Sequence, residues 1–200
     1  MSGPAYRVLM VCTGNICRSP MAERLLAARL RQRLGEASAD IAVGSAGTWG
    51  LVGEPIQPNA VEALIARGGD PSGFQARELT VDLVTEADMV LGMTRDHRAA
   101  AVTLDPRASS RTLTLRELAR LLGPVRAADI PGAEPAERLR GLLTAAIGNR
   151  GMVPVADPRD DDIADPYGLS RVHYERAADE IVMALEVVLD RLQPAGGQPA

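Results

Sequence analysis

One short segment joins an apolar run to a helix-like run through a tight, glycine-containing turn. The apolar run is Val8–Val11, the turn is residues 12–20 with the sequence Cys-Thr-Gly-Asn-Ile-Cys-Arg-Ser-Pro, and the helix-like run begins at Met21. Such an order is typical of a buried strand that leads directly into a helix. The chain is therefore expected to be an α/β protein, with this turn at the edge of the sheet where such folds bind ligands.

The residues of the turn suit the binding of a phosphoryl group. The first amides of a helix have no internal acceptor, and the positive end of the helix dipole lies beside them. Gly14 and Asn15 tolerate the left-handed backbone that lets successive amides point inward. Ser19 is expected to cap the helix, with Pro20 as its first residue. The turn is therefore predicted to cradle a phosphoryl dianion.

Cys12 and Arg18 stand at the two ends of this turn. The helix amides, Arg18 and the Ser19 hydroxyl all favour the thiolate of Cys12, which is the nucleophilic form. The planar guanidinium of Arg18 is shaped for two-pronged contact with a phosphoryl group. The alternative interpretation of Cys12, a buried core thiol, does not explain the uninterrupted order of strand, turn and helix start.

Strand-like and helix-like segments alternate along the rest of the chain. This alternation predicts a doubly wound, four-stranded parallel sheet with helices on both faces. The last helix has the clearest apolar stripe, which runs from Tyr174 to Leu192 behind the cap Ser170. The predicted strands are residues 6–11, 40–43, 88–92 and 111–114, and the predicted helices are residues 20–34, 58–67, 95–102, 115–122, 136–147 and 170–192.

Composition narrows the class of protein. The chain of 200 residues is 46% hydrophobic, enough for one well-buried domain, and its net charge of −4 gives no support for nucleic-acid binding. No segment predicts a signal peptide or a membrane span, so a cytoplasmic protein with two reduced thiols is expected. No set of residues has the spacing of a metal site. His97 and His173 lie in polar helical contexts and are expected on the solvated surface.

Residues 11–20 resemble the phosphate-binding loop of low-molecular-weight protein tyrosine phosphatases. Further matches follow in order: Ser45-Ala46-Gly47-Thr48, Ala76-Arg77-Glu78-Leu79, Ala87-Asp88-Met89-Val90-Leu91 with Met93, and Asp165-Pro166-Tyr167-Gly168. The resemblance covers residues 6–98 and 165–192. It implies the phosphatase I-like fold and hydrolysis of phosphotyrosine through a cysteinyl-phosphate on Cys12, with no cofactor.

The resemblance also assigns roles around the turn. Asn15, Ser19 and Ser45 would hold the loop in shape by hydrogen bonds. Cys17 would form a reversible disulfide with the nucleophile, or would serve only as a small buried residue behind the loop. Many relatives have a histidine where this chain has Phe74, so one supporting hydrogen bond is expected to be absent. The residues implied to surround the phosphoryl group are Thr13, Gly14, Asn15, Ile16, Cys17 and Arg18.

The reaction needs an acid that protonates the leaving oxygen and then accepts a proton from water. Four Asp-Pro dipeptides begin at residues 70, 105, 157 and 165, and by themselves they indicate only turns. Asp165 is favoured because Tyr167 and Gly168 follow it, as in the acid loop of the resembling family. Asp157 is the second choice. The run of residues 160–162 is interpreted as a solvated acidic stretch.

Three side chains bear on the choice of substrate. Trp49 and Tyr167 could enclose a flat phenyl ring, although Trp49 could equally be a packed lid. Ile16 goes with phosphotyrosine, because the branch of the family that hydrolyses phosphoarginine typically has Thr there. The expected partner is a phosphotyrosine protein, a bacterial tyrosine kinase being one candidate, and the expected state is a monomer or weak dimer.

One domain is predicted over residues 1–193, with a disordered tail at 194–200. Residues 123–162 form an insert that is longer than the family's core usually has there. Its predicted helix, residues 136–147, either docks on the body of the protein or forms a lid beside Asp165. Three alternative functions stay open: a phosphoarginine phosphatase, an arsenate reductase that lacks an internal cysteine relay, and a regulatory phospho-binding protein with weak catalysis.

Overall fold

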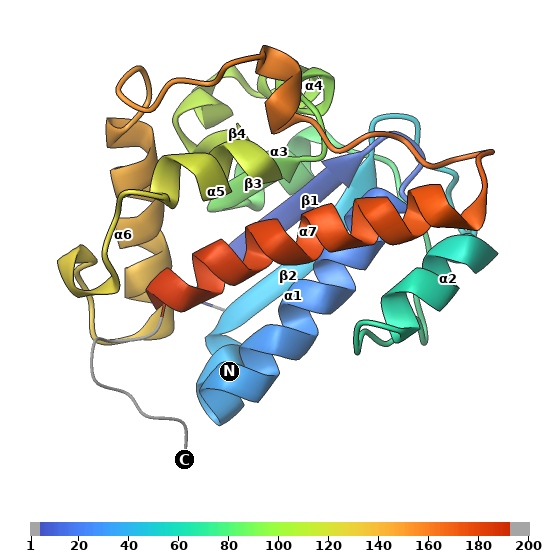
Figure 1. The fold of residues 1–200 in the computed structure, drawn as a ribbon, viewed down its shortest axis with the longest axis horizontal. Coiled ribbons are helices and arrows are strands. Elements are labelled where there is room, and N and C mark those ends of the chain that lie inside the picture. The colour runs from blue at the N-terminus through green and yellow to red at the C-terminus, as the bar shows by residue number, and fades with distance from the viewer. Residues whose placement is uncertain (1–4, 193–200) are drawn as a thin grey trace.

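The computed structural model describes residues 5–192, so the predicted tail at 194–200 lies outside the described residues. Its centre is a parallel sheet in the strand order β2-β1-β3-β4 (Figure 1). The strands are β1 (Tyr6–Cys12), β2 (Ile41–Gly47), β3 (Met89–Gly92) and β4 (Thr112–Thr114). The predicted four-stranded parallel sheet is confirmed.

Helices cover both faces of this sheet. Alternate residues of the buried strand β1 point to opposite faces, so Val8 and Met10 belong to one apolar cluster and Leu9 and Val11 to another. The first cluster packs against α1, α5 and α7, and the second against α3 and α4. The helices are α1 (Arg18–Leu34), α2 (Pro58–Ile65), α3 (Val81–Glu86), α4 (Arg95–Leu104), α5 (Leu115–Leu122), α6 (Pro135–Gly148) and α7 (Arg171–Leu192).

Strand β2 and helix α3 differ from the prediction, and the difference in β2 concerns the site. Strand β2 continues to Gly47, four residues beyond its predicted end, because its small residues pair with β1 despite their low strand propensity. This register places Ser45 beside Met10 and Gly47 beside Cys12. The short helix α3, which the sequence analysis did not predict, begins where the Thr80 side chain accepts a hydrogen bond from the Leu83 amide.

The helix of the insert docks on the body of the protein. Helix α6 packs against α5 and α7, and Arg138 donates to the carbonyls of Ile130 and Leu192 from a position 4% exposed. Arg140 donates to Ala5 O and lies over the ring of Tyr6. Helix α6 is therefore beside the start of β1, at the opposite end of that strand from Cys12 (Figure 1). This placement rules out the interpretation of α6 as a lid beside Asp165.

The end of the insert corrects a second expectation. Asp161 is buried and forms a two-pronged ion pair with Arg120, and Asp162 accepts from the Arg95 amide. The predicted solvated acidic run is therefore wrong at these positions, because two arginines from other elements fold over it. Within residues 5–192, no helix has the length and apolar character needed to cross a membrane.

We predict that α6 contributes stability and not catalysis. Replacing the fully buried Leu142 by Ala should lower the free energy of unfolding by about 2–5 kcal/mol, since it leaves a cavity in the α6 contact. Denaturant unfolding measures that loss, with exposed Thr144→Ala in the same helix as the control. The turnover number at a temperature where both variants are folded should stay near that of the unmodified protein. A large loss of turnover in folded Leu142→Ala would contradict a purely structural role.

Candidate active site

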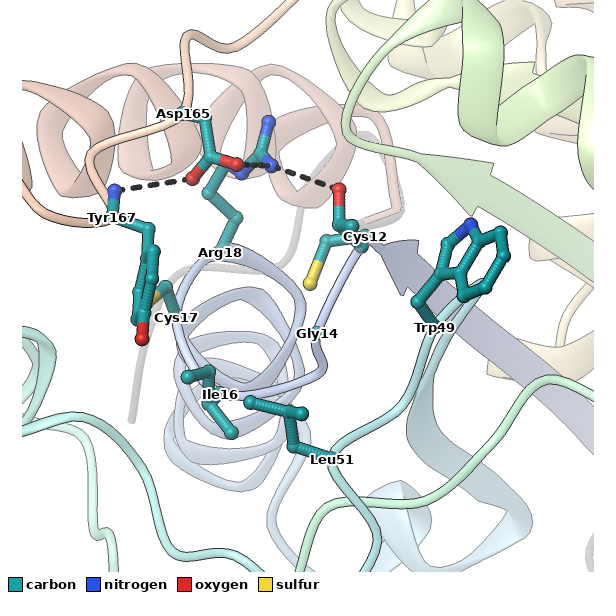
Figure 2. Close-up of a pocket in the computed structure, with 10 residues that line it drawn as sticks. Cys12, Gly14, Ile16, Cys17, Arg18, Trp49, Leu51, Asp165 and Tyr167 are labelled. Carbon is teal, nitrogen blue, oxygen red and sulfur yellow. Dashed lines mark hydrogen bonds and ion pairs between the residues drawn. The ribbon is translucent and has the colours of Figure 1, made fainter.

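The predicted phosphate loop lies between the end of β1 and the start of α1, in the wall of a cavity of about 300 Å³. The residues that line the cavity are Cys12, Thr13, Gly14, Ile16, Cys17 and Arg18 of the loop, together with Trp49, Leu51, Asp165 and Tyr167. Figure 2 shows the Cys12 and Arg18 side chains facing this space, with Asp165 beside Arg18. The fold thus brings residues from three distant parts of the chain to one pocket. Leu51 was not singled out by the sequence analysis.

Asn15 holds the loop from behind. Its backbone is left-handed, with φ of 55°, and its side chain is fully buried. The Asn15 Nδ2 donates to Ser19 Oγ at 2.9 Å and to Ser45 Oγ at 2.8 Å, and its Oδ1 accepts from the Arg77 amide at 2.9 Å. The predicted left-handed backbone is confirmed for Asn15 but is wrong for Gly14, which does not have positive φ.

Ser19 does not cap α1, contrary to the prediction. The helix begins at Arg18, two residues before its predicted first residue Pro20, and no side chain caps it. Instead, Ser19 Oγ accepts from Asn15 and lies 2.9 Å from Cys12 Sγ. The proton of the Ser19 hydroxyl can therefore be donated either to Cys12 Sγ or to the carbonyl oxygen of Ala46, which is 3.5 Å away. A hydroxyl donor at the shorter distance stabilises the thiolate form of Cys12.

Residues 47–57 fix the direction of the loop's peptide groups. The amides of Thr48, Trp49 and Leu51 donate to the carbonyls of Cys12, Thr13 and Gly14 at 2.9–3.1 Å. A carbonyl and the following amide point in opposite directions across a trans peptide, so the next amides along the loop point away from the amides of residues 48–51. Gly47 permits this close approach, because a Cβ there would lie 2.4 Å from the Thr13 carbonyl oxygen.

Arg18 lies almost completely buried at the side of the cavity. Its side chain is 3% exposed; Nη1 donates to the Ile163 carbonyl at 3.0 Å, and Nη2 lies 2.7 Å from Asp165 Oδ2. The Arg18 Nε is buried and has no acceptor among residues 5–192. A buried donor without a partner is costly, so this group is available to an anionic ligand.

The structure separates the two acid candidates. Asp165 lines the cavity, pairs with Arg18 and accepts from the Tyr167 amide at 3.2 Å. Asp157 is instead bound to Arg159 at the surface, where the hydrogen bonds from Arg159 hold the pKa of Asp157 below its usual range. Asp165 is therefore placed to exchange protons with a ligand in the cavity, and Asp157 is not.

Aromatic and aliphatic side chains form the walls of the cavity. Trp49 and Tyr167 lie on opposite sides, with Ile16 and Leu51 between them (Figure 2). The Trp49 side chain is 78% exposed, so it is not the packed lid that the sequence left open. The space between the two rings is therefore open to a flat apolar group.

His97 was predicted on the solvated surface, and this prediction is wrong. The residue is 6% exposed, and its Nε2 lies 3.0 Å from Thr13 Oγ1 in the phosphate loop. Burial lowers the pKa of His97 to about 4, and the positive charge of Arg18 adds to this effect. The sequence carried one signal for His97, its place three residues after Thr94 in the capping box of α4. His173 is exposed as predicted.

Cys17 and the position of Phe74 complete the surroundings of the loop. Cys12 and Cys17 are both free and buried thiols. Burial raises the pKa of the Cys17 thiol to about 12, and the neighbouring Cys12 contributes to this shift. Phe74 packs near the Arg24 guanidinium, while Ser45 donates to Glu23 Oε2 at 2.5 Å. Ser45 therefore has a supporting partner that does not depend on residue 74.

A thiol in the floor of the loop, a guanidinium at its side and a carboxyl group paired with that guanidinium are the groups that a phosphate site of the cysteine-nucleophile type requires. Residues 7–131 match the family described as Low molecular weight phosphotyrosine protein phosphatase. The chain belongs to this family.

Known relatives agree with this assignment. The low molecular weight protein-tyrosine-phosphatase Etp of Escherichia coli (strain K12) is 36% identical over 106 residues, which are 53% of this chain and 66% of that relative. The protein-arginine-phosphatase of Geobacillus stearothermophilus is 30% identical over 187 residues, 94% of this chain and 93% of that relative. A crystal structure of the low molecular weight protein tyrosine phosphatase from T. tengcongensis has a TM-score of 0.65 and 27% identity, and the match covers 92% of this chain and 98% of that one.

Proposed function

We propose that this protein hydrolyses phosphotyrosine in proteins through a cysteinyl-phosphate intermediate. The proposal rests on one observation: Cys12, Arg18 and Asp165 line the same cavity, and Arg18 Nη2 lies 2.7 Å from Asp165 Oδ2. In the proposed steps, the loop amides and Arg18 bind the phosphoryl oxygens and stabilise their charge. These steps therefore use no metal ion. Relatives named as protein-tyrosine-phosphatases support the same conclusion.

The first step transfers the phosphoryl group to the enzyme. The Cys12 thiolate attacks phosphorus, a sulfur–phosphorus bond forms, and the bond from phosphorus to the tyrosine oxygen breaks. Asp165, protonated for this step, gives its proton to the leaving phenolate oxygen. Arg18 stabilises the charge that develops on the equatorial oxygens.

The second step releases phosphate. A water molecule attacks the cysteinyl-phosphate while the Asp165 carboxylate accepts one of its protons. The sulfur–phosphorus bond breaks, and inorganic phosphate leaves from a thiolate that Ser19 stabilises again. The same Asp165 thus acts first as an acid and then as a base, which its half-exposed position beside the cavity permits.

We predict distinct defects for the two catalytic groups. Cys12→Ser should lower kcat/KM for an aryl phosphate by at least about 10³-fold, because the nucleophile is lost. Asp165→Asn should lower kcat by about 10²–10⁴-fold and flatten its pH dependence, because proton transfer is lost. Steady-state hydrolysis across pH, with and without a chelator, measures both effects. Asp157→Asn is the matched control and should keep full activity; activity that survived Cys12→Ser would falsify the mechanism.

The walls favour phosphotyrosine over the second candidate, phosphoarginine. The second candidate has support, because the protein-arginine-phosphatase relative covers 94% of this chain. The cavity edge, however, is formed by the apolar side chains of Ile16 and Leu51 between two aromatic rings. A phenyl ring is buried there without loss of hydrogen bonds, whereas a guanidinium would leave its N–H groups facing apolar carbon.

We predict that Ile16 sets this preference. The unmodified protein should hydrolyse phosphotyrosine peptides with a higher kcat/KM than phosphoarginine peptides. Ile16→Thr should lower the ratio of the two kcat/KM values by about 10-fold or more, because a hydroxyl replaces the ethyl branch of Ile16 beside the substrate. Paired assays of both peptides measure the ratio, and Ile16→Val, which keeps the wall apolar, is the control. A higher rate with phosphoarginine in the unmodified protein would reverse the assignment.

We also infer that Cys17 protects the nucleophile from irreversible oxidation. Peroxide oxidises the Cys12 thiolate to a sulfenic acid, and Cys17 sulfur then attacks that sulfur with loss of water to form a disulfide. The raised pKa of Cys17 keeps it protonated while Cys12 reacts first. An added dithiol reduces the disulfide and returns both thiols.

This inference predicts different recovery after oxidation. A pulse of peroxide should inactivate the protein and Cys17→Ala alike, but a dithiol should restore activity only where Cys17 is present. Residual activity after reduction measures recovery, and mass spectrometry distinguishes the disulfide from sulfinic acid. Equal recovery in Cys17→Ala would remove the protective role and leave Cys17 as a packing residue.

The setting of the reaction follows from the same proposal. The substrate class is a phosphotyrosine protein, and a tyrosine kinase of the same cell is the first candidate to test. We propose a cytoplasmic, metal-independent enzyme, in keeping with a mechanism that uses only side chains and amides. An arsenate reductase with an internal relay would need a third cysteine, and the chain has 2.

A further inference from the structure

His97 and Thr13 join the phosphate loop to the first turn of α4. The His97 Nε2 lies 3.0 Å from Thr13 Oγ1, and neither side chain takes part in the steps above. The turn from β3 into α4 is tight, since a Cβ at Gly92 would lie 2.8 Å from the Arg98 amide nitrogen. The Met93 amide donates to the Val11 carbonyl, so this turn is attached to β1 next to Cys12. His97 is therefore held beside the loop by the backbone of two strands.

The hydrogen bonds of His97 determine which ring nitrogen carries the proton. The Thr94 amide donates to Nδ1 at 3.1 Å, so Nδ1 is an acceptor, and the Thr94 hydroxyl, 2.8 Å from the same nitrogen, is then a second donor to it. In a neutral ring with Nδ1 unprotonated, the proton is on Nε2. The contact at 3.0 Å is therefore a bond that His97 Nε2–H donates to Thr13 Oγ1.

The Thr13 hydroxyl receives a second donor. Arg18 Nη2 approaches Thr13 Oγ1 at 3.5 Å, from the nitrogen that also pairs with Asp165. A hydroxyl has two lone pairs and one proton. With His97 and Arg18 on the lone pairs, the proton of Thr13 is directed away from both, and Thr13 lines the cavity.

We propose that His97 is a positioning residue of this site, which orients the Thr13 hydroxyl so that it donates a hydrogen bond to the phosphoryl group. This inference rests on the proposed function, because it assigns the donor to the same phosphoryl pocket. Thr13 is then a side-chain contact of the phosphoryl group in addition to the loop amides. Arg18 and Thr13 would approach the same side of that group, since they are themselves in contact.

Two pairs of variants separate this role from a structural one. Asn at position 97 keeps an acceptor for the Thr94 amide but is too short to reach Thr13, whereas Gln is long enough to place a side-chain N–H near Thr13 Oγ1. His97→Asn should therefore keep the capping contact and lose activity, and His97→Gln should retain more activity than His97→Asn. From the loop side, Thr13→Val removes the hydroxyl that is the proposed donor, and Thr13→Ser keeps that hydroxyl.

We expect His97→Asn and Thr13→Val each to lower kcat/KM for an aryl phosphate by about 10- to 100-fold, as for one hydrogen bond to a charged group. The double variant should be no worse than Thr13→Val alone, because both changes remove the same bond. The midpoint of thermal unfolding measures how far each variant keeps the hydrogen bond between the Thr94 amide and the side chain at position 97. Full activity of His97→Asn, additive losses in the double variant, or equal losses for Asn and Gln at position 97 would each overturn the proposal.

Calorimetric binding of inorganic phosphate gives a readout that does not depend on turnover. His97→Asn and Thr13→Val should weaken phosphate binding relative to the unmodified protein and to Thr13→Ser. A protein that binds phosphate in this pattern but hydrolyses no aryl phosphate would count against the proposed function alone. Unchanged phosphate affinity in both variants would count against the role of His97, whatever the activity.

Discussion

The buried side chain of Asn15 is the constraint on which the site depends. A left-handed backbone at a residue other than glycine costs about 1–2 kcal/mol, and it persists only where the surroundings fix it. Here three hydrogen bonds do so, to Ser19, Ser45 and the Arg77 amide. Those partners come from α1, from β2 and from the segment after α2, so the loop takes its shape only when these parts are assembled.

The acid and the phosphate clamp are likewise joined by the tertiary structure. Ile163 donates its amide to the Met93 carbonyl and accepts from Arg18 through its own carbonyl. Ile163, two residues before Asp165, is thus bonded both to the end of β3 and to the phosphate loop. Asp161 is fixed to Arg120 on α5 in the same stretch. The end of the insert therefore contributes to the shape of the site, whereas its helix α6 lies at the other end of β1.

Polarity is divided sharply within the pocket. On one side, loop amides and Arg18 offer donors to an anion; on the other, Trp49, Tyr167, Ile16 and Leu51 offer apolar surface. The two thiols also differ in their surroundings. Cys12 has a hydroxyl beside it, whereas burial keeps Cys17 protonated. An ester that joins a phosphoryl dianion to an aromatic ring matches both halves of the pocket.

The sequence by itself predicted the parallel sheet, and it singled out the turn after β1 with Cys12 and Arg18, which the structure places at one cavity, because these features follow from local apolar runs, turn residues and short spacings. It also favoured Asp165 among the four Asp-Pro dipeptides from the residues that follow it and from the resemblance to a family, and the structure places Asp165 in the wall of the cavity. The true extent of β2 and the burial of Asp161 were decided by partners distant in sequence, whereas Ser19 bonds to Asn15 and lies beside Cys12 within its own loop. His97 shows the reason most clearly: its position in α4 indicated a polar helix start, and only the packing of α4 beside β1 turned it toward Thr13.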